Sequence, residues 1–173
     1  IGLIINHALL NVAAVAEAAP ARVAAMFTDQ LTGFDRQYAT WNIYSVNSNS
    51  YGEFWSDGLS AGVSQAQVAK AKAVEAGNAQ IQGIAEILEG YYFAETALVF
   101  GDIPFSEVNN LDFPDPVYEP QATVMNGAIA LIQSGIQKAG SVSAANNVFS
   151  TSSTWSQIGN ALLARYNLAM GNN

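Results

Sequence analysis

Aromatic and polar side chains gather in one segment of the chain, residues 34–51. Its first part reads Phe34-Asp35-Arg36-Gln37-Tyr38-Ala39-Thr40-Trp41-Asn42-Ile43-Tyr44, and Asn47, Asn49 and Tyr51 follow. Sugars have apolar C–H faces that stack on flat rings, and hydroxyls that need amide, carboxylate or guanidinium partners. The segment therefore has the chemistry of a glycan site, for which we predict five ligand contacts: Arg36, Tyr38, Trp41, Asn42 and Tyr44.

A structural interpretation of the same segment is equally open. Tryptophan and tyrosine in a connection between helices also fold back to cover apolar helix faces, because their rings bury a large area. Sequence alone does not separate an exposed ligand platform from a cover over the core.

Candidate catalytic groups are few. His7 lies in an apolar stretch without a serine or cysteine nucleophile motif, so we interpret it as a structural residue. Glu86 and Glu89 are three residues apart with no histidine at metal-ligand spacing, which favours a solvated helix face. Asp112 and Asp115 are a weak candidate pair for glycoside hydrolysis, since nothing sets their separation. We predict a protein that is not an enzyme and has neither a metal nor a cofactor.

A long helix with an ordered end dominates the middle of the chain. Apolar residues recur every three or four positions over 78–100, which predicts one helix. Gly101 tolerates the left-handed conformation that ends helices, and Pro104 prevents the helix from resuming. Further prolines keep residues 113–120 extended. Tyr91-Tyr92-Phe93 point in successive directions on this helix, so we expect them to pack in the core.

Similar periodicity predicts the remaining helices, and no segment gives a confident strand pattern. Antiparallel helices with short connections are typical of bundles and of tetratricopeptide-like arrays, and the sequence alone barely separates these two all-α folds. The expected helices are residues 3–31, with Pro20 as a kink or a new start; 50–59 and 64–76, either continuous or separate, with Gly62 as a weak point and Ser64 as an N-cap; 121–139; and 154–170, capped by Thr154. Residues 33–49 and 140–153 are expected to connect them.

Two charged residues invite structural roles. Asp102 follows a helix C-terminus, where its charge opposes the helix dipole, so we expect it to bind backbone amides of its own turn. Arg165 is the only basic residue of the last helix, and we predict that it forms a structural salt bridge or a carbonyl cap inside the helix array, with Asp102 as the expected partner.

Two ordered motifs carry a family resemblance. Tyr91-Tyr92 late in a helix, then Phe100-Gly101-Asp102-Ile103-Pro104 and Pro116-Val117-Tyr118-Glu119-Pro120-Gln121, form the first. The second is Thr154-Trp155-Ser156-Gln157-Ile158-Gly159-Asn160-Ala161-Leu162-Leu163-Ala164-Arg165, which is similar to a Trp…Asn-x-Leu-x-x-Arg helix. Together they resemble the SusD/RagB-like family of outer-membrane nutrient-binding lipoproteins.

The resemblance implies an all-α fold, a tetratricopeptide-like array of antiparallel helix pairs with irregular loops. It implies that residues 1–173 are a single helical domain, the N-terminal part of a longer protein whose signal peptide and lipidated cysteine lie upstream. It also implies capture of an oligosaccharide or other nutrient at the Gram-negative cell surface and its delivery to a TonB-dependent, SusC-like transporter. Sugar-binding members use an early aromatic from an inter-helix region, with further aromatics from the later half. The alternative is a helical-repeat scaffold that binds a peptide or protein partner.

The amino-acid composition limits the kinds of partner that the protein can bind. Fourteen acidic residues against six basic ones give a formal charge of −8, which repels nucleic acid and anionic lipid. The chain has no cysteine, and so no disulfide, thiolate ligand or lipid-attachment site. Asn6, His7, Asn11 and Glu17 interrupt the most apolar end, from which we expect no membrane span. Membrane association would then depend on a lipid anchor outside this chain.

Overall fold

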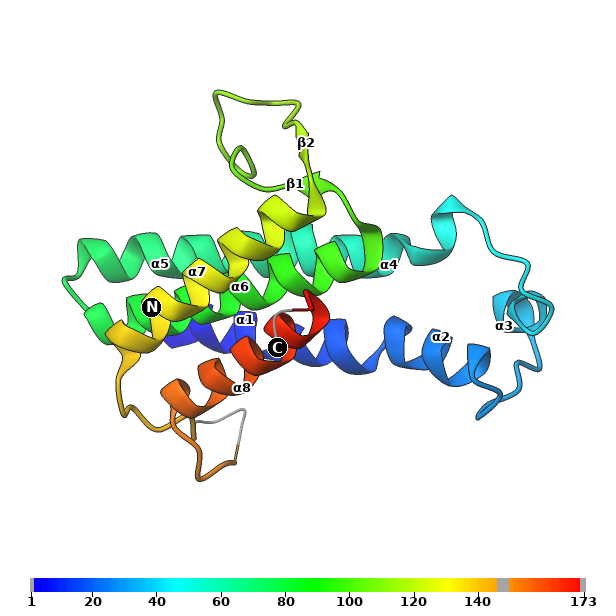
Figure 1. Ribbon diagram of the computed structural model, residues 1–173, viewed down its shortest axis with the longest axis horizontal. Coiled ribbons are helices and arrows are strands. Elements are labelled where there is room, and N and C mark those ends of the chain that lie inside the picture. Colours follow the sequence, from blue (N-terminus) through cyan, green and yellow to red (C-terminus); the bar gives the residue numbers. More distant parts are fainter. Residues whose placement is uncertain (1, 146–149, 172–173) are drawn as a thin grey trace.

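The computed structural model describes residues 2–145 and 150–171, and it is 69% helical with one very small sheet. The predicted all-α fold is confirmed, although part of the expected 140–153 connection lies outside the described residues. In chain order the elements are α1 (Gly2–Glu17), α2 (Ala19–Phe27), α3 (Arg36–Trp41), the 3-10 turn η1 (Ser48–Tyr51), α4 (Gly52–Trp55), the π-helical segment η2 (Ser56–Val63), α5 (Ser64–Glu75), α6 (Ala79–Phe100), β1 (Ile103–Pro104), β2 (Tyr118–Glu119), α7 (Gln121–Ala139) and α8 (Trp155–Ala169) (Figure 1).

Helix α6 forms the centre of the molecule, with α5 and α7 packed along it (Figure 1). Twelve consecutive residues, from Gly83 to Ala94, are buried, so this helix is enclosed on every side. Tyr91, Tyr92 and Phe93 are 7%, 0% and 1% exposed, which confirms that they belong to the core. The Tyr92 hydroxyl donates a hydrogen bond to the Ala8 carbonyl and so joins α6 to α1.

Polar contacts establish the directions of the last three long helices. Lys138, near the end of α7, contacts Glu86 near the start of α6, so these two helices are antiparallel. Arg165, late in α8, contacts Glu95, late in α6, so α8 runs parallel to α6 and antiparallel to α7. This alternation fits an array of antiparallel helix pairs.

Glycines allow α6 and α7 to approach closely. A Cβ on Gly90 would lie 2.6 Å from the Ala128 carbonyl oxygen, and a Cβ on Gly135 would lie 2.5 Å from the Gly83 oxygen. A side chain at either position would push the two backbones apart, so these glycines set the spacing of the pair.

Residues 52–75 form one continuous helical run, the first of the two arrangements that the sequence left open. The predicted N-cap at Ser64 is wrong, because Ser64 has helical φ and ψ of −59° and −45° and its backbone continues the run. The weak point expected at Gly62 is instead a site of close packing, where a Cβ would lie 2.4 Å from the Tyr92 ring. The π-helical turns of η2 occupy this place. Pro20, by contrast, lies in the first turn of α2, as one of the two predicted alternatives had it.

A two-residue strand pair interrupts the helices between α6 and α7. Ile103 pairs with Glu119 and Pro104 with Tyr118 in an antiparallel register. The pair closes residues 105–117 into an excursion that projects from the helices, at the top of Figure 1. Sequence predicted the extended backbone here but not the pairing.

Three carboxylates on α6 each bind a cation from a different neighbouring helix. Glu86 pairs with Lys138 of α7, Glu89 with Lys70 of α5, and Glu95 with Arg165 of α8. The solvated face predicted for Glu86 and Glu89 is wrong: they are 5% and 3% exposed, because α5 and α7 cover this part of α6.

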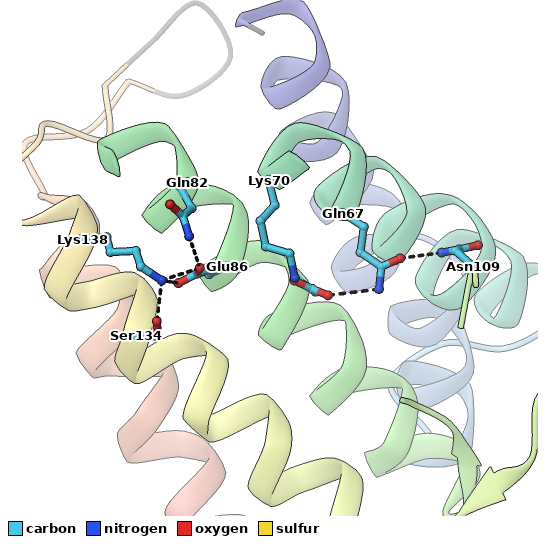
Figure 2. A network of polar contacts seen from close by, with 8 residues as sticks. Gln67, Lys70, Gln82, Glu86, Asn109, Ser134 and Lys138 are labelled. Atoms are coloured by element: carbon cyan, nitrogen blue, oxygen red, sulfur yellow. Dashed lines mark hydrogen bonds and ion pairs between the residues drawn. The ribbon is translucent and has the colours of Figure 1, made fainter. Parts of the chain in front are cut away.

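Two of these ion pairs belong to larger networks. Around Glu86, both Gln82 and Lys138 donate hydrogen bonds to the carboxylate, and Lys138 also donates to the Ser134 hydroxyl (Figure 2). Around Glu89, the carboxylate accepts from Gln67 as well as from Lys70. Every carboxylate that the helices bury here therefore has hydrogen-bond partners, as burial of a charge requires.

The predicted contact between Arg165 and Asp102 is also wrong. Arg165 Nη1 lies 2.9 Å from Glu95 Oε1, because α8 places it one turn or more before the end of α6. Asp102 does not bind the amides of its own turn either. Its Oδ1 accepts the backbone N–H of Gln121, the first residue of α7.

The N-terminal helices are more apolar than the sequence analysis, which expected no membrane span, had indicated. Gly2–Phe27, which spans α1 and α2, is by length and composition apolar enough to cross a membrane, with a mean hydropathy of 1.4 over its most apolar window. A mostly buried core helix and an N-terminal signal sequence both pass the same test, and 22% of this window is buried. Here Ile5, Ala8, Leu9 and Val15 are buried, and α1 packs against η2 and α5.

Candidate functional site

The predicted aromatic segment folds as a short helix held in a closed loop. Asp35 accepts the N–H of Arg36 and so caps α3. The Asn42 side chain accepts the N–H of Gly33 and donates to the Gly33 carbonyl, which fastens the two ends of the loop. The backbone passes so close at Gly33 that a Cβ there would lie 2.0 Å from the Tyr38 carbonyl oxygen. The segment is thus an ordered unit and not a loose connection.

A cleft of about 330 Å³ lies between this unit and the helices beside it, and we refer to it as the α2–α3 cleft. Trp41 forms part of its wall and is only 6% exposed, while Tyr38 stands edge-on to it with ring centroids 5.4 Å apart. Amide, hydroxyl and charged side chains form the rest. The lining residues are Ala19, Arg22, Gln37, Tyr38, Trp41, Asn47, Asn49, Ser50 and Glu53.

Arg22 contributes an unsatisfied donor to this cleft. Its Nε is buried and has no hydrogen-bond partner among the described residues, while its Nη2 lies 3.6 Å from Glu53 Oε2. A buried donor without a partner is costly, so such groups are commonly found where a water or a ligand supplies the acceptor. Sequence reasoning missed Arg22. One signal was present, since Arg22 is the only lysine or arginine among the first 35 residues.

A second hollow of about 220 Å³ adjoins the cleft and shares Arg22 and Tyr38 with it. Its other walls are mainly apolar, and Phe34, with 96% of its surface exposed, stands at its edge. The Tyr38 ring therefore lies between a polar compartment and an apolar one. The remaining lining residues of this second hollow are Met26, Leu31, Thr32 and Gly33.

The structure brings together only some of the predicted contacts. Tyr38 and Trp41 line the α2–α3 cleft, whereas Arg36, Asn42 and Tyr44 do not. Arg36 is exposed and lies 3.7 Å from Asp35 in an ion pair, and Tyr44 is 62% exposed and packs on Phe27 with centroids 5.3 Å apart. The segment thus combines both interpretations left open by the sequence, since Trp41 is buried while Tyr44 faces solvent.

A larger hollow, of about 680 Å³, lies elsewhere, beneath the excursion of residues 105–117. Asp115 lines it and Asp112 does not, so the two aspartates that sequence offered as a hydrolytic pair do not share one cavity. We call this hollow the excursion pocket. Its lining residues are Trp55, Leu59, Ser60, Pro104, Val108, Asn109, Asn110, Leu111, Phe113, Pro114, Asp115, Pro116 and Tyr118.

The described part of the chain has no cluster of side chains that could bind a metal ion. No three histidine or acidic side chains come together there in a way that could hold an ion. His7 is exposed on α1.

The fold and these hollows define the class of protein: an all-α protein whose candidate binding sites are surface hollows lined by aromatic and amide side chains. Residues 1–173, the whole chain, match the SusD-like_2 family, described as starch-binding associating with outer membrane. The chain belongs to this SusD-like family, which confirms the resemblance seen in its motifs. Family membership implies carbohydrate binding in association with the outer membrane. No curated protein matches the chain.

Proposed function

We propose that this protein captures an oligosaccharide at the outer-membrane surface and delivers it to a TonB-dependent, SusC-like transporter. It would act there as a lipid-anchored binding protein and not as an enzyme. The observation that carries the proposal is the match of the entire chain to a starch-binding family associated with the outer membrane.

The α2–α3 cleft is the site we propose for capture. Tyr38 offers a ring for the apolar face of a sugar, and the Arg22 guanidinium, on a side chain that is 41% exposed, offers donors for a hydroxyl oxygen. Asn47 and Asn49 add amides at the rim. Of the contacts predicted from sequence, Tyr38 and Trp41 fit this role best, and Arg36, Asn42 and Tyr44 would act by shaping the surrounding loop.

A glycan-panel binding measurement on the protein tests this site. We expect Tyr38→Ala to weaken binding of a recognised oligosaccharide by about tenfold, the loss of one stacking contact. Ile43→Ala is the matched control, because Ile43 is 74% exposed in the same segment and does not line the cleft. Trp41→Ala is less useful, since Trp41 is buried and its loss would disturb folding. Equal binding by Tyr38→Ala and the unaltered protein would remove the cleft from the proposal.

Delivery and anchoring need separate measurements. Co-purification of the protein with a TonB-dependent transporter from outer membranes supports delivery, and fatty-acid labelling in cells supports the anchor. The alternative is a scaffold for a peptide or protein partner, which would bind no glycan in the panel.

A further inference from the structure

We propose that the excursion pocket is a second carbohydrate-binding site, selective for neutral oligosaccharides and separate from the α2–α3 cleft. The inference rests on the proposed function for the class of ligand. The pocket and the cleft have no lining residue in common. At about 680 Å³ the pocket falls within the usual range of ligand sites, roughly 300–1,000 Å³.

The excursion is a closed loop fastened at its base. The Val117 N–H donates to Glu107 Oε2 at 2.8 Å, and the Ser106 N–H donates to Glu119 Oε1 at 2.6 Å. Each bond crosses from one arm of the loop to the other, next to the β1–β2 pair. The pocket is therefore preformed, and ligand binding does not have to order the loop.

A polar chain ties the excursion to the helices. Asn109 Nδ2 donates to Gln67 Oε1, and Gln67 donates in turn to the buried Glu89 carboxylate (Figure 2). The Ser64 hydroxyl also donates to Asn109 Oδ1 at 3.1 Å. Asn109 has a φ of +60°, a conformation in which asparagine is several-fold enriched. These contacts hold one side of the pocket against α5.

Aromatic rings form another part of the wall. Trp55 and Tyr118 are nearly parallel, at 19°, with centroids 6.1 Å apart, and Phe100 packs edge-on against Trp55 at 5.1 Å. Trp55 is thus fixed from behind, while Tyr118 is 64% exposed and Phe113 is 45% exposed. Exposed rings held in place in this way are suited to stacking on sugar faces.

Polar groups without partners accompany the rings. Among the described residues neither the Asp115 carboxylate nor the Ser60 hydroxyl has a hydrogen-bond partner, and both line the pocket. The π-helical segment η2 supplies Ser60 and, beside it, Leu59. A carboxylate accepts hydrogen bonds from two adjacent sugar hydroxyls, whose oxygens in turn accept from a serine.

The charge around the pocket selects the ligand. No lysine or arginine occurs between Lys72 and Lys138, whereas this stretch carries several carboxylates. Asp115 in the lining would repel an acidic sugar, and no lining residue is a lysine or arginine that could offset this repulsion, whereas a neutral sugar would not be repelled. The acidic residues within and next to the excursion are Asp102, Glu107, Asp112, Asp115 and Glu119.

Titration of the protein with neutral and acidic oligosaccharides tests the inference. The probes are neutral fragments of starch, xylan and mannan, and oligogalacturonate as the acidic one. We expect Tyr118→Ala to weaken binding of a neutral oligosaccharide by about tenfold. Val117→Ala is the control, since Val117 is the adjacent residue, is 58% exposed and does not line the pocket. Asp115→Asn, which removes no contact within the fold, should weaken binding severalfold.

The outcomes separate this inference from the proposed function. Binding unchanged by Tyr118→Ala but lost in Tyr38→Ala overturns the second site and leaves capture at the cleft in place. Tyr118-dependent binding of oligogalacturonate overturns the neutral selectivity. No binding of any neutral oligosaccharide by the unaltered protein overturns both proposals. Thermal unfolding of each variant confirms that a loss of binding is not a loss of folding.

Discussion

The Asp102 carboxylate accepts the backbone N–H of Gln121 at 2.9 Å across nineteen residues of sequence. Helix α7 is preceded by Pro120, whose side chain has no acceptor, so Asp102 acts as its cap from the other side of the β1–β2 pair. Gln121 Nε2 donates back to the Ala97 carbonyl in the last turn of α6, at 2.7 Å. The two contacts join the end of one helix to the start of the next. The charge of Asp102, unfavourable to α6, favours the N-terminus of α7.

Loss of this cap should destabilise the protein. We expect Asp102→Ala to lower the free energy of unfolding by about 1 kcal/mol, as for other lost helix caps, and Asp102→Asn to retain much of it because an amide oxygen also accepts. Denaturant unfolding measures both. Asp112→Ala is the control, an exposed aspartate of the excursion, and it should change stability by less than about 0.5 kcal/mol. Equal effects of the two alanine variants would contradict the capping role.

The Glu86–Lys138 pair should matter far more than a surface pair. Lys138→Met leaves the Glu86 carboxylate buried without its cation. This should cost about 3 kcal/mol of unfolding free energy, the lower end of the range for a broken buried pair, because Lys138 is 33% exposed. Lys72→Met, which breaks an exposed pair with Glu75, should cost less than about 0.5 kcal/mol. Chemical denaturation compares the two, and similar losses would argue against burial as the cause.

Stability should fall in acid partly through Glu86. Burial raises the pKa of its carboxyl, but hydrogen bonds from Lys138, Ser134 and Gln82 outweigh burial and lower the pKa below the ordinary 4.5. A carboxyl with a lowered pKa in the folded state stabilises the protein above its unfolded pKa. That stability is lost as pH falls through the folded pKa.

The pH dependence is measured by unfolding the protein from neutral pH to below pH 4.5. Glu86→Gln cannot titrate, so its stability should fall less steeply over the acid range than that of the unaltered protein. Parallel curves for the two proteins would show that Glu86 makes no net contribution to acid unfolding.

Gly90 should not tolerate a methyl group. An alanine there gains about 1 kcal/mol of helix propensity, but its Cβ would lie 2.6 Å from the Ala128 carbonyl oxygen and force α6 and α7 apart. Overpacking of this kind costs about 1–3 kcal/mol or more, so we expect a net loss of stability. Gly52→Ala is the matched control, because Gly52 begins α4 with a φ of −60° and nothing lies within 4 Å of its Cβ position. It should be neutral or stabilising, and thermal unfolding distinguishes the two variants.

Local signals in the sequence determined most of the helices. Gly101 ends α6 with a φ of +80°, and Thr154 caps α8, both as predicted, while the capping box that Thr154 forms with Gln157 was not predicted. The family motifs were also legible without a structure, because each is a short run of residues. These features depend on backbone conformation and on neighbours three or four residues away, so a single chain read in order reveals them.

Tertiary structure alone decided which distant side chains meet. Glu86 and Glu89 looked like surface residues because their partners come from α7 and α5, and helix rotation and register set those contacts. For the same reason Arg165 binds Glu95 and not Asp102. The unpaired Nε of Arg22 could be identified only from the packing of α2 beside α3. The excursion pocket likewise joins η2 to residues about fifty positions later. Periodicity shows that a helix has a buried face, but what covers that face is a property of the whole packed array.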